Sequence, residues 1–174
     1  MKYLIVVDMQ NDFVSGSLGS EDAERIVPAV CEKIKAYLNQ ESRIFVTLDT
    51  HGENYLSTSE GKNLPVVHCV KETNGWELEN RVKTALNGQG EYYEKNTFGS
   101  VRLANHLSEI VKDGDSIELC GLCTDICVVT NALMIKAFCP ETEVIVSADC
   151  CAGVTKEKHL AAIETMKSCQ IKIK

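Results

Sequence analysis

Short runs of apolar residues alternate along this chain with segments whose apolar residues recur at helical spacing. Continuous apolar runs at residues 2–7 and 43–48 predict buried strands, and shorter runs predict strands at 91–94, 116–119, 143–146 and 170–173. Helical spacing predicts helices at about 20–38, 76–86, 100–111, 125–137 and 156–167. Alternating strands and helices are typical of a parallel sheet with helices on both faces, so we expect a three-layer α/β fold.

The length and charge of the chain limit its class. Its 174 residues contain no repeat, low-complexity tract or linker, so we expect a single domain over residues 1–174. A net charge of -7 argues against nucleic acid or an anionic membrane as partner. No apolar run approaches the length of a membrane span, and the first residues do not have a signal-peptide layout. Nine cysteines cannot all pair, which favours a reduced, cytoplasmic setting.

Four residues capable of chemistry follow the predicted strands. Asp8 and Asp49 end apolar runs, Lys95 follows the short run at 91–94, and Cys127 follows the run at 116–119. Ligands bind beyond the carboxyl ends of the strands in parallel sheets, so we expect these side chains to converge although they are far apart in sequence.

The stretch CGLCTDICVV at 120–129 reads as strand, turn and helix, with Cys127 in the first turn of the helix. The positive end of the helix dipole predicts a lowered pKa for this thiol and a reactive thiolate, although a buried structural cysteine is the alternative. A half-buried Asp8 would have a raised pKa and suit a general base, or it could cap the next turn. Lys95 would stabilise both charges, unless it is an ordinary solvated lysine.

A second group of polar residues has the composition of a metal site. Asp49 and His51 form D-x-H, His68 follows in H-C-V, and Glu60 lies between them. Such a set suits Zn²⁺, Mn²⁺ or Fe²⁺, and the alternative is two surface histidines with a capping aspartate. The C-x2-C-x3-C spacing of Cys120, Cys123 and Cys127 raises a competing thiolate site for zinc or iron–sulfur.

Five motifs, taken in order, resemble the isochorismatase-like cysteine hydrolase superfamily and, within it, the nicotinamidases. They are VVDMQNDF at 6–13, TLDTH at 47–51, HCVKETNGWEL at 68–78, EKNTFGS at 94–100 and CGLCTDICV at 120–128. The resemblance implies a parallel sheet of about six strands flanked by helices. It also implies a catalytic set that consists of Asp8, Lys95 and Cys127.

The resemblance extends to the surroundings of the catalytic set. It implies metal ligands at Asp49, His51 and His68, with Glu60 as a possible fourth. It implies a cis peptide between residues 122 and 123, and an oxyanion hole formed by the backbone N–H groups of Cys123 and Cys127. Phe13 matches a phenylalanine that lines the family's ring pocket, and Leu64 stands near the place where nicotinamidases carry tryptophan.

The activity implied is hydrolysis of a small-molecule amide through a Cys127 thioester, with nicotinamide giving nicotinate and ammonia. Members of the family are often oligomers, so a homo-oligomer is possible. One alternative is another small amide, a ureide or isochorismate as substrate. Another, of a different class, is a non-catalytic protein that senses oxidants or binds metal through its thiols.

Overall fold

A computed structural model describes the whole chain, residues 1–174, and its centre is one six-stranded sheet. The strand order is β3-β2-β1-β4-β5-β6, and every neighbouring pair is parallel. The expected parallel sheet of about six strands is therefore confirmed. The strands are β1 Lys2–Val7, β2 Ser42–Asp49, β3 Glu91–Lys95, β4 Ser116–Leu122, β5 Glu143–Ala152 and β6 Lys172–Ile173.

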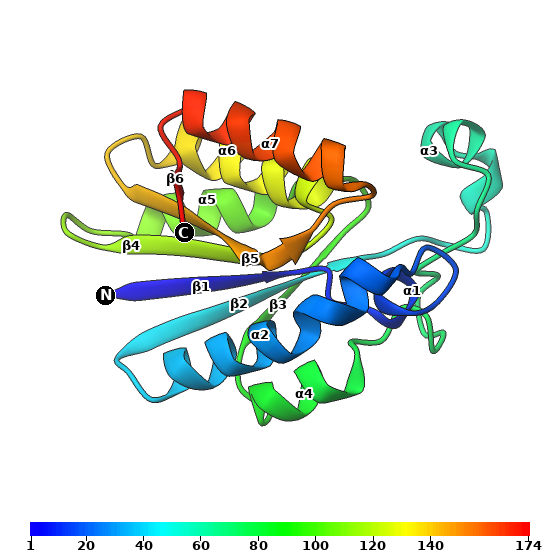
Figure 1. The fold of residues 1–174 in the computed structure, drawn as a ribbon, viewed down its shortest axis with the longest axis horizontal. Helices are drawn as coiled ribbons and strands as arrows, with labels where there is room; N and C mark the ends of the chain where they lie inside the picture. Colours follow the sequence, from blue (N-terminus) through cyan, green and yellow to red (C-terminus); the bar gives the residue numbers. More distant parts are fainter.

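Helices cover both faces of this sheet, as the alternating pattern predicts (Figure 1). Alternate side chains of β1 pack into two separate cores: Leu4 and Val6 face the core with α2, and Ile5 and Val7 face the core with α5 and α6. The helical segments are α1 Asn11–Val14, α2 Glu21–Leu38, η1 Tyr55–Ser57, α3 Ser59–Asn63, α4 Asn80–Leu86, α5 Val101–Ile110, η2 Thr124–Val128, α6 Val129–Phe138 and α7 Lys156–Ser168.

The helix expected at 76–86 is wrong at its start, because α4 begins only at Asn80. The preceding residues pair instead with the turn after β1: Gln10 and Leu78 form an antiparallel bridge, and the N–H of Glu79 donates to the carbonyl of Met9 at 2.8 Å. Glu79 then caps the helix, since its carboxylate accepts the N–H groups of the first turn. Tertiary pairing thus overrides the helical spacing of this segment.

Two strands are longer than predicted, and one proline is tolerated within a helix. β4 continues to Leu122 and β5 to Ala152, because a register shift after Leu119 lets the two strands pair to their ends. α2 runs through Pro28, which lies on the exposed side of the helix.

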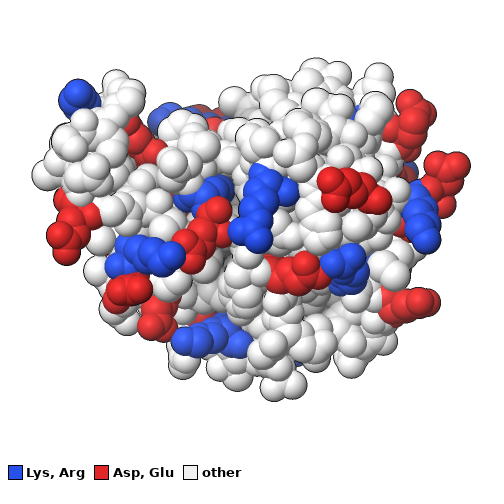
Figure 2. Space-filling model, turned by 180° about the vertical axis from the view of Figure 1, so that it is seen from behind, with Lys and Arg blue, Asp and Glu red and all other residues white.

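The irregular segment expected at 50–74 contains only the short helices η1 and α3, which project from the body beyond the carboxyl ends of the strands (Figure 1). No helix combines the length and apolar character needed to cross a membrane. On the face shown in Figure 2, acidic and basic side chains alternate over the surface.

Gly121 explains how β4 lies so close to β1 near the site. Its φ is +122°, and a Cβ at this position would lie 2.1 Å from the carbonyl oxygen of Val7. Only glycine fits such a close approach with that backbone. The turn that leads to Cys127 is thereby held beside the end of β1, where Asp8 stands.

Candidate active site

The candidate site lies at the carboxyl ends of the central strands, in a cavity of about 390 Å³. Its walls come from the turn after β1, from the segment that contains α3, from the loop after β3 and from the turn after β4. The lining includes Phe13, Leu64, His68, Phe98, Cys123 and Cys127. Phe13 and Leu64 thus both lie where the resemblance puts pocket residues.

Lys95 connects the residues that the sequence singles out. Its ammonium nitrogen lies 2.7 Å from a carboxylate oxygen of Asp8, 3.2 Å from one of Asp49 and 3.5 Å from the sulfur of Cys127. The side chain is almost completely buried. One cation therefore contacts the candidate base Asp8, the candidate nucleophile Cys127 and the candidate metal ligand Asp49.

Asp8 is fully buried, with one oxygen in a hydrogen bond and the other in an ion pair but without a hydrogen bond. Thr47 donates to one oxygen at 2.6 Å, while Lys95 contacts the other. Asp8 adopts φ = +47°, an unusual value for a residue other than glycine. Such backbone strain gathers at functional sites and persists only where the surroundings fix it, here through Thr47 and Lys95.

Burial raises the pKa of Asp8, and the ammonium of Lys95 opposes that effect. The pKa of Lys95 itself is raised, because the neighbouring Asp8, Cys127 and Asp49 outweigh the burial of the ammonium group. The sequence-based expectation of a lowered pKa for Cys127 is wrong. Burial and the Asp8 carboxylate raise its pKa well above the usual value, and Lys95 compensates only in part. A thiol with a raised pKa needs a base to remove its proton, and the Asp8 carboxylate contacts the same Lys95 ammonium as the Cys127 sulfur.

The turn that holds Cys127 is a short π-helical segment, η2, followed directly by α6. The peptide bond between Leu122 and Cys123 is cis, as the resemblance implies. The backbone N–H of Cys123 makes no hydrogen bond within the protein, so it is free to donate to a ligand. Behind the nucleophile, the buried Asn131 donates to the carbonyl of Cys127 at 2.8 Å and braces the turn.

Asp49, His51, Glu60 and His68 gather beside this site, with one potential ligand atom from each within 4.8 Å of the others. The Nε2 atom of His68 lies 3.4 Å from Asp49 and 3.7 Å from Glu60, and that of His51 lies 3.7 Å from Glu60. Ligands about 2.1 Å from a tetrahedral metal are about 3.4 Å apart, so these three separations suit a divalent ion, while His51 and Asp49 lie closer, at 2.9 Å.

The chemistry of this donor set also fits a metal. The ring Nδ1 of His68 contacts the carbonyl of Val66 at 2.7 Å, which leaves Nε2 directed at the group. Burial and the nearby Asp49 raise the pKa of Glu60. Two carboxylates held this close with two imidazoles would be stabilised by a cation between them.

The competing thiolate site is not present. Cys120, Cys123 and Cys127 do not come together as a ligand group, and Cys120 is fully buried in β4. All nine cysteines are free, including the adjacent Cys150 and Cys151.

Several residues at the site were not predicted from the sequence. Thr47 bonds Asp8, Tyr55 packs against both histidines, and Asn131 braces the nucleophile turn. Phe98 and Gln10 lie inside quoted motifs, which was the one available signal. Tyr55 and Asn131 lie outside all five motifs, so no pattern in the chain indicated them.

The comparisons with known proteins agree with this geometry. A family model described as the isochorismatase domain matches residues 2–173. The chain is 26% identical to the nicotinamidase/pyrazinamidase of Mycobacterium tuberculosis, over 99% of its own length and 98% of that protein.

Two solved structures are similar along the whole chain. The pyrazinamidase of Pyrococcus horikoshii in complex with zinc superposes with a TM-score of 0.81 at 30% identity, covering 99% of this chain and 98% of that one. The pyrazinamidase/nicotinamidase of Streptococcus mutans has a TM-score of 0.88 at 24% identity, with complete coverage of both chains, and supports the fold alone.

Proposed function

Because this chain belongs to the isochorismatase family and is a hydrolase of amide bonds, we propose that its substrate is nicotinamide, which it converts with water to nicotinate and ammonia. The observation that carries the proposal is the contact of one buried ammonium, on Lys95, with both Asp8 and Cys127, of which Cys127 lines the cavity. The cavity also has the apolar walls that a pyridine ring prefers, including Phe13 and Phe98.

In the first half of the reaction, the carboxylate of Asp8 takes the proton of the Cys127 thiol. The thiolate attacks the carboxamide carbon, and a C–S bond forms. The N–H groups of Cys123 and Cys127 stabilise the oxyanion, an effect of about 3–4 kcal/mol per donor in comparable sites. As the C–N bond breaks, Asp8 returns its proton to the departing nitrogen, and ammonia leaves.

In the second half, water attacks the thioester carbon while Asp8 takes one of its protons. The C–S bond breaks, nicotinate forms, and the thiolate of Cys127 recovers a proton from Asp8. Lys95 stabilises the negative charge when it is on the carboxylate of Asp8 or on the sulfur of Cys127. The raised pKa of Asp8 suits a group that must both take and return a proton.

Asp49, His51, His68 and Glu60 would hold a divalent metal at the edge of the cavity. Such an ion would supply a Lewis acid for positioning the pyridine ring of the substrate or an ordered water. The Pyrococcus horikoshii relative was crystallised in complex with zinc, which supports Zn²⁺ as the first ion to test.

The test is ammonia release from nicotinamide by purified protein, before and after chelation. We expect turnover that is lost in Cys127→Ala and retained in Cys139→Ala, another buried cysteine outside the site. Activity that persists in Cys127→Ala would refute the mechanism. Turnover of other carboxamides or ureides, but not of nicotinamide, by metal-loaded protein would refute the substrate and preserve the family.

A further inference from the structure

The turn that follows β1 contacts both segments that carry the candidate metal ligands. Gln10 is fully buried, and its side-chain amide binds the backbone of Asp49 through two hydrogen bonds. The side-chain oxygen accepts the N–H of Asp49 at 2.8 Å, and the side-chain nitrogen donates to the carbonyl of Asp49, also at 2.8 Å. The same nitrogen donates to the carbonyl of Trp76 at 2.8 Å. No other amino acid of this length can both accept and donate in this way.

Asp12 holds the second segment, two residues further along the same turn. Its carboxylate accepts the N–H of Cys69 at 2.8 Å. Gly75 permits this approach, since a Cβ there would lie 2.1 Å from a carboxylate oxygen of Asp12. Cys69 directly follows His68 and adopts φ = +45°, so its backbone needs an external contact to stay in place.

The backbone of Cys69 also reaches the other histidine. Its carbonyl accepts the N–H of His51 at 2.9 Å, and the N–H of Lys71 donates to the carbonyl of His51 at 2.9 Å. A contact that fixes the peptide of Cys69 therefore fixes both histidines. Phe13, the next residue of the turn, adds a ring contact to His68 at 5.5 Å between centroids.

We propose that Gln10 and Asp12 are positioning residues for the metal centre: they hold the backbones that carry Asp49, His51 and His68 in the geometry that binds a divalent cation. This inference rests on the metal site of the proposed function. Neither residue is among the ligand group, so each acts through a ligand-bearing segment. Loss of such an outer contact typically costs about 10–100-fold in metal affinity.

The experiment measures Zn²⁺ affinity by competition with a chromophoric chelator, in wild type and in variants. Asp12→Ala removes the acceptor for the N–H of Cys69, whereas Asp12→Asn keeps an oxygen that can accept it. Gln10→Met keeps the volume of the side chain but loses all three hydrogen bonds. The matched control is Asp115→Ala, since Asp115 accepts a backbone N–H from Lys112 at a similar 2.9 Å, at the opposite end of β1.

We expect Zn²⁺ to bind Asp12→Ala and Gln10→Met about 10–100-fold more weakly than wild type. Asp12→Asn should recover most of the affinity, and Asp115→Ala should bind as wild type does. Should Asp12→Ala fail to fold, Gln10→Met and Asp12→Asn supply the comparison. Alkylation of Cys127, followed by peptide mass spectrometry, should proceed at the wild-type rate in Asp12→Ala, which a general disruption of the site would not allow.

Affinity unchanged in both Asp12→Ala and Gln10→Met would overturn the proposal, and so would equal losses in Asp12→Ala and Asp115→Ala. Wild-type protein that binds no Zn²⁺ would overturn it as well. In that case, nicotinamide turnover by the metal-free protein would show that the proposed reaction survives without the metal centre.

Discussion

Replacing Lys95 with methionine removes the one cation that lies between Asp8, Asp49 and Cys127 and leaves the volume of the side chain nearly unchanged. The substitution leaves two buried carboxylates without their shared partner. It also removes the positive charge that lowers the pKa of Asp8 and of the Cys127 thiol. Lys95→Met should therefore weaken both the fold and the nucleophile.

The size of the stability loss follows from burial. Lys95 and Asp8 are almost entirely inaccessible to solvent, and removing one partner of such a pair costs about 3–5 kcal/mol. For a chain of this length, that corresponds to a fall of roughly 6–20 °C in Tm. Protonation of Asp8, whose pKa is already raised, limits the cost.

The control is Lys71→Met. Lys71 and Glu94 have the same 2.7 Å separation as Lys95 and Asp8, but both are about half exposed, and an exposed pair contributes only about 0–1 kcal/mol. Urea and thermal unfolding of metal-free protein measure the stability, and iodoacetamide labelling of the Cys127 peptide at pH 7 measures the thiol. The reasoning would be refuted if Lys95→Met proved as stable as Lys71→Met, or if iodoacetamide labelled its Cys127 at the wild-type rate.

Three further changes test other parts of the molecule. Hydrogen bonds from Lys33, Ser147 and Tyr37 outweigh burial and lower the pKa of Glu118 to about 2. The lowered pKa stabilises the fold by about 3 kcal/mol at pH values above the ordinary carboxyl pKa, and this contribution is lost as the pH falls toward 2. The urea stabilities of wild type and Glu118→Gln should therefore converge below pH 4, and parallel curves would contradict this. Gly121→Ala should lose at least about 2 kcal/mol in urea unfolding, because its Cβ would meet the β1 backbone. Asn131→Ala should lose about 1–3 kcal/mol and lower kcat for ammonia release, while an unchanged kcat would exclude it as a brace of the nucleophile turn.

The sequence predicted the fold well where apolar runs were long. β1 and β2 read directly as buried strands, and the helix predicted at about 20–38 corresponds to α2, which Ser20 caps by accepting the N–H of Ala23. The strand ends were harder to predict, because β5 extends past Val146 and its pairing with β4 resumes only at Cys151 and Ala152, after a register shift. The prediction of the start of α4 was wrong for the same reason, because residues before Asn80 pair with the turn after β1.

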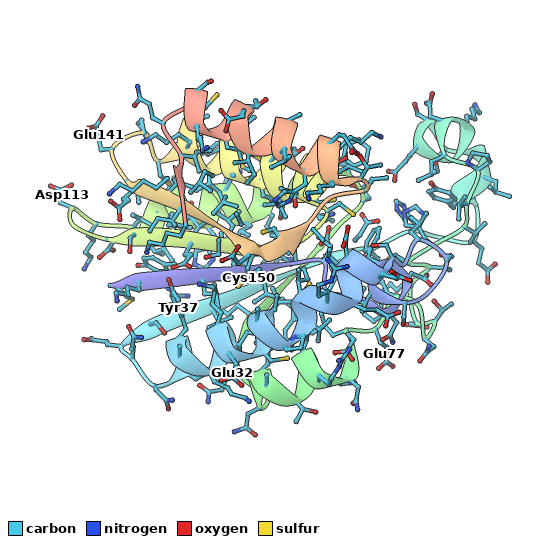
Figure 3. All side chains as sticks on the ribbon, viewed as in Figure 1. Glu32, Tyr37, Glu77, Asp113, Glu141 and Cys150 are labelled. Atoms are coloured by element: carbon cyan, nitrogen blue, oxygen red, sulfur yellow. The ribbon has the colours of Figure 1, made fainter.

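The convergence of the candidate residues could be predicted from the sequence, whereas the pKa of Cys127 could not. Asp8, Lys95 and Cys127 lie at or beyond the carboxyl ends of parallel strands, so the topology itself brings them together. The pKa of Cys127 depends on how deeply the turn is buried, and a helix start visible in sequence says nothing about that depth. Tyr37 of α2, labelled in Figure 3, illustrates a similar limit, because its hydroxyl donates to the buried Glu118 of β4 and no sequence pattern indicates that contact.

The position of β1 at the centre of the sheet has a consequence for how the chain becomes functional during synthesis. Lys2 pairs in register with Ser42 of β2 on one side and with Ser116 of β4 on the other. One partner of β1, the first strand to be synthesised, is therefore translated much later. Pairing over such a sequence separation is slow. Asp8 emerges early and Cys127 late, and α6 must follow before Asn131 can brace the turn. A ribosome-bound chain that stops before β4 would leave one edge of the apolar strand β1 unpaired and would lack Cys127.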